Sequence, residues 1–502
     1  MSKVKTNILA NYFGSFWQMA MSLLFVPLYI RFLGIESYGI IGFFSSLTVV
    51  LYLLDMGLST TFSREIARLS PTRTLDNTIR NLLSTFSRAY WVISIIAGIL
   101  FIALSPLFAG HWLKAQHISA SVISDATILM GLSIIVQWPG TIYSGGINGL
   151  QKQVHGNFVA IIMSTIRGGG VVLLLWLVAP TLHAFFLWQI GCNLTQTIIY
   201  AIVLQIDLRD VRGKGRFDWD VLRQTWKFSA GMLGANILAT VLMQTDKILL
   251  SKLVLLEQFG YYTLAGSVAG VIFALIGPIN SAMFPRFTEL VALQDENNFI
   301  SIFHLSCQLI SFVVFPLWAI LTFFPHEVLF VWTHNHTIAN STGPILSLIA
   351  TGNMLNSMTS ELYYVQLSHG YTKLSIIVNA VSVLFLVPLI FILVHVFGIK
   401  GGASVWVILN SGYVLIGVHF VYRIYLTKEK WKWYLNDILR FAIPCIITVL
   451  VMKYLMHFVS ESRLFDLAML SITMIACIAV MFAVMPSLMR QQIKAFFAIA
   501  KS

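Results

Sequence analysis

The stretch IIMSTIRGGGVVLLLWLV, residues 161–178, decides the fold class because it has close to the length of a membrane-spanning helix and is almost uniformly apolar. About 20 apolar residues in helical conformation cross a hydrocarbon core of roughly 30 Å. The single charged residue of the stretch, Arg167, stands near its centre. A cation at that depth costs about 2.5–3.5 kcal/mol on insertion scales, so it normally has a partner or a task.

The rest of the chain has the same character. Of its 502 residues, 58% are hydrophobic and only 10% are charged, which excludes an ordinary soluble protein. Apolar runs recur from one end to the other and predict an all-α polytopic membrane protein, because lipid offers no partner for an open strand edge. We expect about fourteen spans, centred near residues 19, 50, 97, 133, 167, 193, 238, 271, 312, 355, 384, 412, 448 and 475.

Basic residues predict the orientation, since they accumulate in cytoplasmic loops. With a cytoplasmic amino terminus, most of the 32 lysines and arginines fall in inner segments. The outer loops then keep only Arg31, Lys114, Lys252, Lys400, Lys453 and Arg463. Both termini are therefore expected in the cytoplasm. The first span has no small-residue cleavage site after it and is expected to be retained.

The net charge of +12 is thus mainly a topology signal. The charge is scattered over separate loops and forms no single patch, so nucleic-acid binding is not expected. The four cysteines lie inside apolar spans without CxxC spacing, and we expect small packing residues there and no metal site. His326, His334 and His336 are expected to be solvated loop residues. No nucleotide-binding or hydrolase motif is present, which favours a transporter or channel over an enzyme.

The chain also repeats itself. The segment RFLGIESYGIIGFFSSL at 31–47 has an echo in SKLVLLEQFGYYTLAGSV at 251–268, where Glu36 and Gly39 correspond to Glu257 and Gly260. A helix face that includes Tyr52, Asp55 and Ser59 is followed by an echo at the same phase. The period predicts two six-helix lobes, residues 1–224 and 225–436, facing each other across a central cavity, with two additional helices in 437–502.

Polar faces on other helices agree with a water-lined centre, although ordinary hydrogen bonding between helices would give the same stripes. One face of the first span carries Asn11, Ser15, Gln18 and Ser22, and one face of the seventh carries Asn236, Thr240, Gln244 and Lys247. Pro139 and Pro278 lie within spans, where proline removes a backbone hydrogen bond and kinks or hinges a helix.

An ordered set of segments carries a family resemblance: PLYIRFLGIESYGIIGFFSSL, LLDMGLSTTFSREIA, GGINGLQKQVHGN, QTDKILLSKLVLLEQFGYY and the FGIKGGA turn at 397–403. Together they resemble the Wzx-type flippases of O-antigen and related repeat units, in the MATE-like (MOP) exporter superfamily. The resemblance implies transport of an oligosaccharide on undecaprenyl pyrophosphate from the inner to the outer leaflet of the bacterial inner membrane. It also implies contact with membrane lipid and with the polysaccharide polymerase machinery.

Such a substrate gives Arg167 a task, because a guanidinium binds the oxygens of a pyrophosphate bidentately where the dielectric is low. A structural contact that locks two helices is the alternative for Arg167. Gly168, Gly169 and Gly170 beside it leave room for close approach. The other headgroup candidates are basic residues and the polar residues of the two stripes: Arg31, Arg88, Lys247, Gln18 and Gln244. Arg88, Lys247 and Arg31 could equally place their charges in the interface.

The acidic residues within spans raise the question of ion coupling. Asp55, Asp246 and Glu361 either bind protons or Na⁺ or neutralise nearby arginines. Coupling is not required, because an anion moving outward across an inside-negative membrane gains about 2.3 kcal/mol per charge per 100 mV. No other cofactor is expected.

Two rival functions stay open. A MATE-type drug and cation antiporter shares the architecture but favours an acidic cavity, whereas the interior charges here lean basic. A peptidoglycan-precursor flippase differs only in the sugar attached. A membrane-bound polymerase or glycosyltransferase would need a long extramembrane loop with catalytic acids, and no loop of that length is present. The sugar carried, the coupling ion and the oligomeric state cannot be read from the sequence.

Overall fold

Long apolar runs interrupted by proline, glycine and polar capping residues form the helices of this chain, and a computed structural model shows how they pack. Side chains cap the N-termini of several helices: Thr181 accepts a hydrogen bond from the N–H of Ala184, and Asn335 accepts one from the N–H of Ile338. The structure describes residues 2–55, 57–70, 76–209, 215–220, 223, 240–370, 373–456, 462–486 and 489–490. In these ranges every regular element is helical, as the composition predicts.

The chain divides into two compact units, Met1–Gly260 and Tyr261–Ser502, called here the first and the second unit. The expected lobe boundary at residues 224 and 225 lies outside the described residues. The helices of the first unit are α1 (Ser2–Leu24), α2 (Val26–Leu33), α3 (Ile35–Leu51), η1 (Tyr52–Asp55), α4 (Leu58–Leu69), α5 (Asp76–Ala103), α6 (Ser105–Leu107), η3 (Phe108–Trp112), α7 (Ala120–Gln137), α8 (Pro139–Gly149), α9 (Gln153–Leu177) and α10 (Leu182–Asp207). A further helix covers 240–253.

Helix α12 (Leu256–Ala269) contains the boundary between the units. The second unit continues with α13 (Val271–Ala292), α14 (Glu296–Phe323), α15 (Pro325–Thr333), α16 (His336–Ser368), α17 (Lys373–Gly412), η4 (Tyr413–Gly417), α18 (Val418–Tyr425), α19 (Lys430–Lys432), η5 (Trp433–Leu439), α20 (Arg440–Met456) and α21 (Arg463–Val484).

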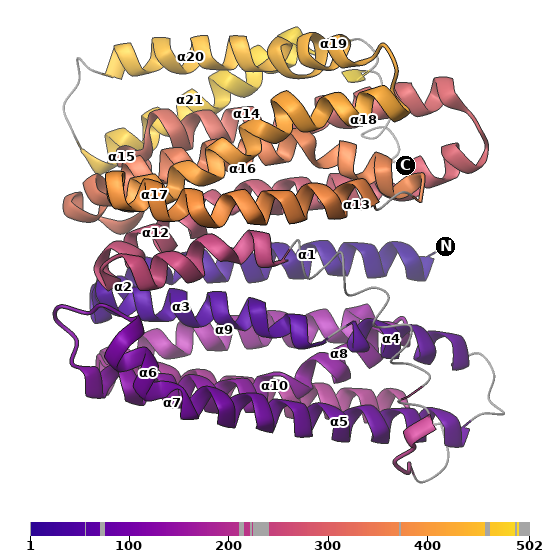
Figure 1. The fold of residues 1–502 in the computed structure, drawn as a ribbon, viewed down its shortest axis with the longest axis vertical. Coiled ribbons are helices and arrows are strands. Elements are labelled where there is room, and N and C mark those ends of the chain that lie inside the picture. The colour runs from indigo at the N-terminus through magenta and orange to yellow at the C-terminus, as the bar shows by residue number, and fades with distance from the viewer. Residues whose placement is uncertain are drawn as a thin grey trace. The chain divides into compact units, whose positions relative to one another are not determined.

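Each unit is a bundle of helices that share buried apolar faces. In the first unit α9 packs against α1 and α10, and α7 packs against α5 and α10 (Figure 1). In the second unit α16 packs against α13, α14 and α17, while α20 and α21 pack together and against α14. Large aromatic side chains such as Phe62, Phe86, Phe303 and Phe315 fill these bundles and are almost completely buried.

Ten described helices are long and apolar enough to cross a membrane, so the chain is a multi-pass membrane protein. The expected number of about fourteen is not reproduced for identifiable reasons. Helix α3 is shorter than a full span, and the centre expected at residue 238 lies outside the described residues. Helix α16, at the span expected near residue 355, is long but is not among the ten. The spans expected near residues 384 and 412 are joined in one helical stretch, Ile376–Tyr425, which is interrupted at Gly398 with φ 58° and ψ −143°.

The span expected near residue 50 is not one straight helix. Helix α3 gives way to the 3₁₀ turn η1, and Gly57 then adopts the left-handed conformation with φ 67° before α4 begins. Glycine suits this position because it has no Cβ to clash at positive φ. The polar face predicted through Asp55 is therefore broken at Asp55 itself, which places this carboxylate at a gap between two helices.

The repeated glycines mark a close helix approach within the first unit. A Cβ added at Gly39 would lie 2.5 Å from the carbonyl oxygen of Leu256, and one at Gly260 would lie 2.3 Å from that of Ile35. Glu36 accepts from the backbone N–H groups of Gln116 and His117, at 2.6 and 3.0 Å. The segment at 31–47 thus has a packing role, in which only glycine allows the backbones to approach so closely.

Candidate functional site

Arg167 lies in the middle of α9 and faces α10 within the first unit. Its Nη2 donates to Oδ1 of Asn193 at 2.8 Å and to Oε1 of Gln196 at 2.5 Å. Its Nε is buried and has no hydrogen-bond partner. The guanidinium is therefore oriented by two neutral carboxamides while one of its N–H donors stays unused.

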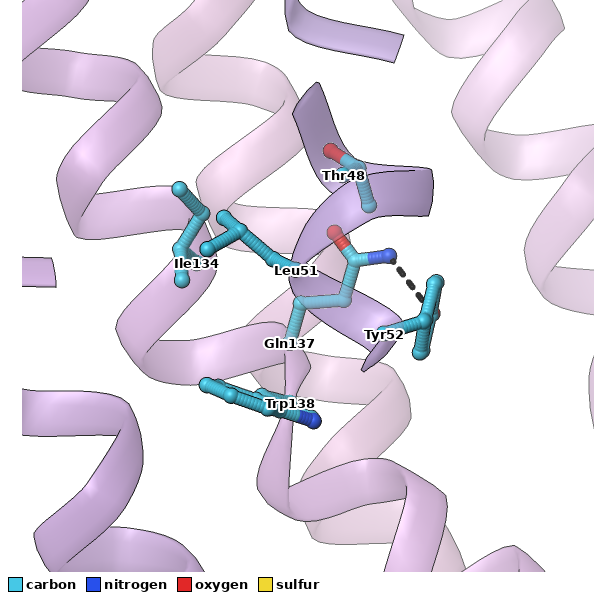
Figure 2. Close-up of a pocket in the computed structure, with 6 residues that line it drawn as sticks. All are labelled: Thr48, Leu51, Tyr52, Ile134, Gln137 and Trp138. Carbon is cyan, nitrogen blue, oxygen red and sulfur yellow. Dashed lines mark hydrogen bonds between the residues drawn. The ribbon is translucent and has the colours of Figure 1, made fainter. Parts of the chain in front are cut away.

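The two carboxamides extend this contact into a network. Nδ2 of Asn193 donates to Oγ of Ser133 at 2.8 Å and to Oε1 of Gln137 at 3.3 Å. Nε2 of Gln137 in turn donates to the hydroxyl of Tyr52 at 3.3 Å (Figure 2). On the other side, Nε2 of Gln196 donates to the hydroxyl of Tyr200 at 3.2 Å. A chain of neutral groups thus connects Arg167 with two tyrosines.

The charge of Arg167 has no carboxylate partner among the residues that the structure describes. Its only side-chain hydrogen-bond partners in the described parts of the chain are the neutral carboxamides of Asn193 and Gln196. An unpaired cation in a low-dielectric interior is costly unless other dipoles or an anion stabilise it. The carboxamides around Arg167 supply dipoles, but no anion of the described residues neutralises its charge.

The glycines that follow Arg167 serve ring packing, which corrects the expectation that they leave room beside it. A Cβ at Gly168 would lie 2.2 Å from Cδ2 of Phe25, and one at Gly170 would lie 2.1 Å from Cζ2 of Trp188. At Gly169 the nearest atom would be 3.5 Å away, an ordinary contact. Two of the three glycines are thus filled by aromatic rings, which fix α9 against its neighbours.

Asp55 is bound by hydroxyl groups. Its Oδ2 accepts from Oγ of Ser59 at 2.7 Å, and its Oδ1 accepts from the hydroxyl of Tyr90 on α5. No basic side chain forms an ion pair with it in the described parts of the chain, so the expected alternative of neutralising an arginine is not seen. Because hydroxyl groups do not neutralise its charge, the Asp55 carboxylate can bind a cation or a proton.

The other predicted headgroup residues are not gathered around Arg167 by any hydrogen bond of the described chain. Arg31 and Arg88 are exposed on α2 and α5. Gln18 donates to the carbonyl of Gly14 one turn earlier on α1, at 3.1 Å. Nζ of Lys247 donates locally to Oε1 of Gln244 at 3.3 Å.

Glu361 on α16 is completely buried in the second unit, and neither of its carboxyl oxygens has a hydrogen-bond partner. The nearby hydroxyl of Ser306 donates to the carbonyl of Phe303 instead. Asp246 is half-buried next to Lys247. Of the three acids singled out in the sequence, Glu361 is therefore the most deeply buried.

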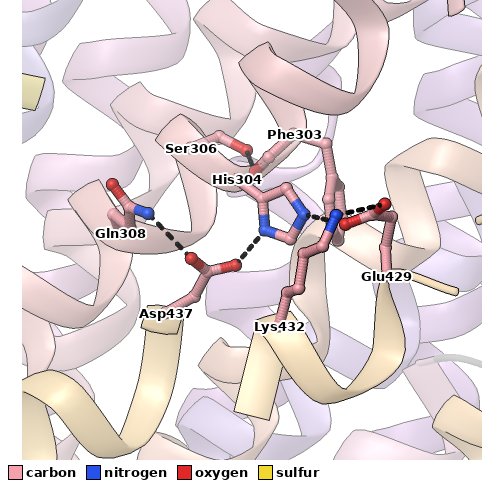
Figure 3. A network of polar contacts seen from close by, with 7 residues as sticks. All are labelled: Phe303, His304, Ser306, Gln308, Glu429, Lys432 and Asp437. Atoms are coloured by element: carbon pink, nitrogen blue, oxygen red, sulfur yellow. Dashed lines mark hydrogen bonds and ion pairs between the residues drawn. The ribbon is translucent and has the colours of Figure 1, made fainter. Parts of the chain in front are cut away.

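A second charged cluster lies in the second unit and was not anticipated (Figure 3). His304 on α14 faces two carboxylates: Nε2 contacts Oε2 of Glu429 at 3.0 Å, and Nδ1 contacts Oδ2 of Asp437 on η5. Lys432 bonds Oε1 of Glu429 at 2.9 Å, and Gln308 bonds Oδ1 of Asp437 at 2.8 Å. Since both ring nitrogens face carboxylate oxygens, His304 is best satisfied as an imidazolium.

The His304 cluster is electrically neutral, and we call it the closed cluster. Its two cations, His304 and Lys432, match its two anions, and each carboxylate oxygen has a donor. Burial raises the pKa of Glu429, but hydrogen bonds from Lys432 and His304 outweigh it and hold the pKa below its usual value. The cluster joins α14 to the segment before α20 and so ties the C-terminal helices to the rest of the second unit.

Spacing could have pointed to the missed residues of the first unit. Ser133 and Gln137 are four positions apart on α7, and Asn193, Gln196 and Tyr200 follow an i, i+3, i+7 pattern on α10. Each pattern puts polar groups on one helix face. For the His304 cluster no such signal exists, because its acids follow its histidine by more than a hundred residues.

The described residues were also considered as metal ligands. No group of three His, Cys, Asp or Glu side chains in the described residues could hold a metal ion. All four cysteines are buried free thiols. Of the histidines expected to be solvated, His334 and His336 are exposed and His326 is half-buried. His326 and His336 also stack on Phe330, with ring centroids 6.1 and 4.0 Å away.

Comparisons with known proteins agree on family and fold. Residues 28–335 match a family described as "Polysaccharide biosynthesis protein". A Shigella flexneri protein named as a candidate O-antigen transporter is 22% identical over 387 residues, 75% of this chain and 87% of its own length.

Two solved structures are similar over most of the chain. One is the lipid II flippase MurJ in an inward closed conformation, with a TM-score of 0.69 at 15% identity over 97% of this chain and 99% of its own. The other is an inward-facing multidrug resistance MATE family transporter of the MOP superfamily, with a TM-score of 0.66 at 14% identity over 81% and 94%. At these identities the likeness shows a MATE- and MurJ-like fold. The proteins named in these comparisons are transporters or flippases and not enzymes.

Proposed function

This chain belongs to the polysaccharide biosynthesis protein family, and from that premise we propose that it is a flippase for a lipid-linked polysaccharide precursor. The substrate is an undecaprenyl-pyrophosphate-linked oligosaccharide, an O-antigen or similar repeat unit, moved from the inner to the outer leaflet by alternating access. The protein then resides in the bacterial inner membrane with both termini in the cytoplasm, and it delivers its product to the polysaccharide polymerase machinery.

The observation that carries the proposal is the state of Arg167. A half-buried guanidinium is held in place by two neutral carboxamides, has a buried Nε–H donor without a partner and lacks an acid partner among the described residues. A pyrophosphate supplies the missing negative charge and accepts hydrogen bonds from the planar guanidinium. Because the guanidinium is partly withdrawn from water, the charge-assisted bond is stronger there than in solution.

The remaining basic and polar candidates extend the path of the headgroup in this proposal. Arg31 and Arg88 are exposed, which suits residues that receive or release an anion at an interface. Lys247 and Gln244 form one local pair, and Gln18 supplies a carboxamide on α1. These residues contribute attraction along the way, whereas Arg167 holds the headgroup at depth.

Glu361 is the candidate for ion coupling in the proposal. An ionised carboxylate at its position would have no hydrogen bond to replace lost hydration, so a bound proton or a Na⁺ ion stabilises it. Asp55, bound by Ser59 and Tyr90, is the second candidate. Asp246 has a charge-balancing role beside Lys247. If Glu361→Gln keeps the wild-type response of flipping to external pH and sodium, coupling through Glu361 is excluded.

One observation favours a second candidate function, a MATE-type cation antiporter. The carboxylate of Asp55, free of basic partners in the described residues and held by hydroxyls, suits recognition of a cation. Arg167 argues against it, because an unpaired guanidinium in the same unit repels cationic drugs. A peptidoglycan-precursor flippase satisfies the Arg167 argument equally well and differs only in the sugar.

The test is the leaflet distribution of undecaprenyl-pyrophosphate-linked oligosaccharide in cells that lack the protein. We expect accumulation on the cytoplasmic side, rescue by wild type, and no rescue by Arg167→Gln present at normal levels. Arg167→Lys separates charge from geometry, since lysine keeps the charge and loses the planar fork. Normal lipid distribution together with raised sensitivity to cationic drugs would reject the flippase and favour the antiporter.

A further inference from the structure

The turn at 426–429 joins two long apolar helical stretches of the second unit. The stretch before it, Ile376–Tyr425, and the stretch after it, Lys430–Leu455, are both long and apolar enough to cross a membrane. Figure 1 shows them meeting at one end of the unit, where α18 is followed by α19. A connection this short between two spans stays at the membrane surface, among the lipid headgroups. Its basic residues predict the cytoplasmic side.

The helices on the two sides of the turn are in contact. On η5 the hydroxyl of Tyr434 donates to the carbonyl of Val414 on η4. Closer to the turn, Nζ of Lys430 lies 3.4 Å from Nδ1 of His419 on α18. The two contacts have an antiparallel register, because the residue numbers fall on one side as they rise on the other. The turn is thus the tip of a helical hairpin, where side chains from both helices meet.

The closed cluster removes the negative charge of this hairpin from its surface. Glu429 in the turn and Asp437 on η5 are the only acids between residues 414 and 440. They are 7% and 0% exposed, and both point toward His304 (Figure 3). Glu429 also binds Lys432. The outer surface of the hairpin therefore carries no acidic side chain of its own.

Three cations at the tip of the hairpin have no acid partner. They are Arg423 near the end of α18, Lys428 in the turn and Lys430 at the start of α19. Arg423 and Lys428 are exposed, and Lys430 is half-buried. Among the described residues no carboxylate forms an ion pair with any of the three, since Glu429 is bound by His304 and Lys432. The tip thus has a local excess of positive charge.

Next to these cations, both helices turn apolar side chains outward. One exposed apolar residue recurs every four positions on each side of the turn: Ile416, Phe420 and Ile424 before it, and Trp431, Leu435 and Leu439 after it. Their exposed fractions lie between 40% and 69%. Residues four apart share one helix face, so each helix has an apolar face that leads to the cations. Nζ of Lys430 lies 5.5 Å from the centre of the Trp431 ring, which places an aromatic ring beside the charges.

We propose that the tip of the hairpin is a binding site for an anionic phospholipid of the cytoplasmic leaflet. Its phosphate binds between Arg423, Lys428 and Lys430, and its acyl chains cover the apolar faces of the two helices. Cations beside a membrane surface attract anionic headgroups, and tryptophan is enriched at headgroup level. An acidic cytoplasmic protein would match the charges but would leave the apolar faces to other lipids. The site needs no assumption about the transported substrate.

The experiment measures the most tightly bound phosphatidylglycerol on the full-length protein in detergent, by native mass spectrometry. Phosphatidylcholine, which has no net charge, and glycerol 1-phosphate, which has no acyl chains, are the comparison probes. Each juxtamembrane cation raises the affinity for anionic lipid about fivefold. We expect the single variants Arg423→Gln, Lys428→Gln and Lys430→Gln to bind phosphatidylglycerol about fivefold more weakly, and the triple variant about a hundredfold more weakly.

The matched control is the variant Lys114→Gln/Lys252→Gln/Lys400→Gln, which removes the same charge from the segments predicted to lie outside. It should bind phosphatidylglycerol as wild type does. An equal loss in this control, or wild-type binding by the triple variant at the tip, would reject the site.

The probes decide which ligand the surface takes. Equal binding of phosphatidylcholine by wild type would show that the charge of the headgroup plays no part and would overturn the proposal. Glycerol 1-phosphate that binds as tightly as phosphatidylglycerol would replace the lipid by a free phosphate. Poly-glutamate that displaces phosphatidylglycerol from wild type but does not bind the triple variant would assign the surface to an acidic protein. None of these outcomes changes the proposal for Arg167, since flipping is not measured.

Discussion

Arg167 in the first unit and His304 in the second unit are both nitrogen bases inside helical bundles, but their surroundings differ in one respect. His304 lies between two carboxylates, with Lys432 completing a neutral cluster (Figure 3). Arg167 is held only by the carboxamides of Asn193 and Gln196. In the closed cluster of His304 all charges are neutralised within the protein, so the cluster holds helices together. The charge of Arg167 is open, that is, no acid of the described residues neutralises it, and it can bind an anion.

The largest effect is expected from opening the closed cluster. His304→Leu leaves the fully buried Asp437 without its cation, and breaking a buried ion pair costs about 3–5 kcal/mol. The midpoint of thermal unfolding in detergent should fall accordingly. The double variant His304→Leu/Asp437→Leu should recover part of the loss, because no buried charge is then left alone. An unchanged midpoint in the single variant would show that the cluster is not structural.

Removing the open cation should have the opposite signature. Arg167→Met deletes a buried charge that lacks an acid partner in the described residues, so we expect unfolding at or above the wild-type temperature. Flipping should fall by about a hundredfold, since the charge-assisted contact with the headgroup is lost. Reconstituted vesicles with a labelled lipid-linked substrate measure the rate. A variant that unfolds early and flips normally would reverse the assignments of the two regions.

A smaller effect separates packing from substrate access next to Arg167. Gly170→Ala would place a Cβ 2.1 Å from Trp188, and overpacking of this kind costs about 1–3 kcal/mol. Gly169→Ala is the matched control, since its nearest contact would be 3.5 Å away. We expect a lower unfolding midpoint for the first variant and wild-type behaviour for the second. Equal midpoints would contradict the packing role of Gly170.

The smallest effect concerns pH in the closed cluster. The pKa of Glu429 is lowered in the folded protein, so its ionised form contributes stability above its usual pKa of 4.5, and this is lost as pH falls through the lowered value. Glu429→Gln should therefore unfold earlier than wild type at pH 7. The difference should shrink as pH falls below the lowered pKa. A difference that persists there would assign the effect to side-chain packing.

The sequence predicts the fold class well because each membrane helix is determined by one continuous run of apolar residues, such as 161–178. The number of spans was harder, since helix breaks at Gly57 and Gly398 depend on single backbone conformations. Arg167 was identifiable because a lone charge in an apolar run is rare. Its partners Asn193 and Gln137 were not, because they become neighbours only when α7, α9 and α10 pack. The cluster around His304 required two segments far apart in the chain.

The most direct test of the central claim closes the open site by one nearly isosteric change. Asn193→Asp puts a carboxylate against Arg167, which now lies 2.8 Å from the Asn193 oxygen, and so imitates the surroundings of His304. Binding of farnesyl pyrophosphate to this variant is the measurement, with thermal unfolding recorded on the same sample. The account predicts a folded protein that has lost pyrophosphate binding, because the cation is already neutralised. Wild-type binding by Asn193→Asp would contradict the claim that the open charge of Arg167 attracts the headgroup.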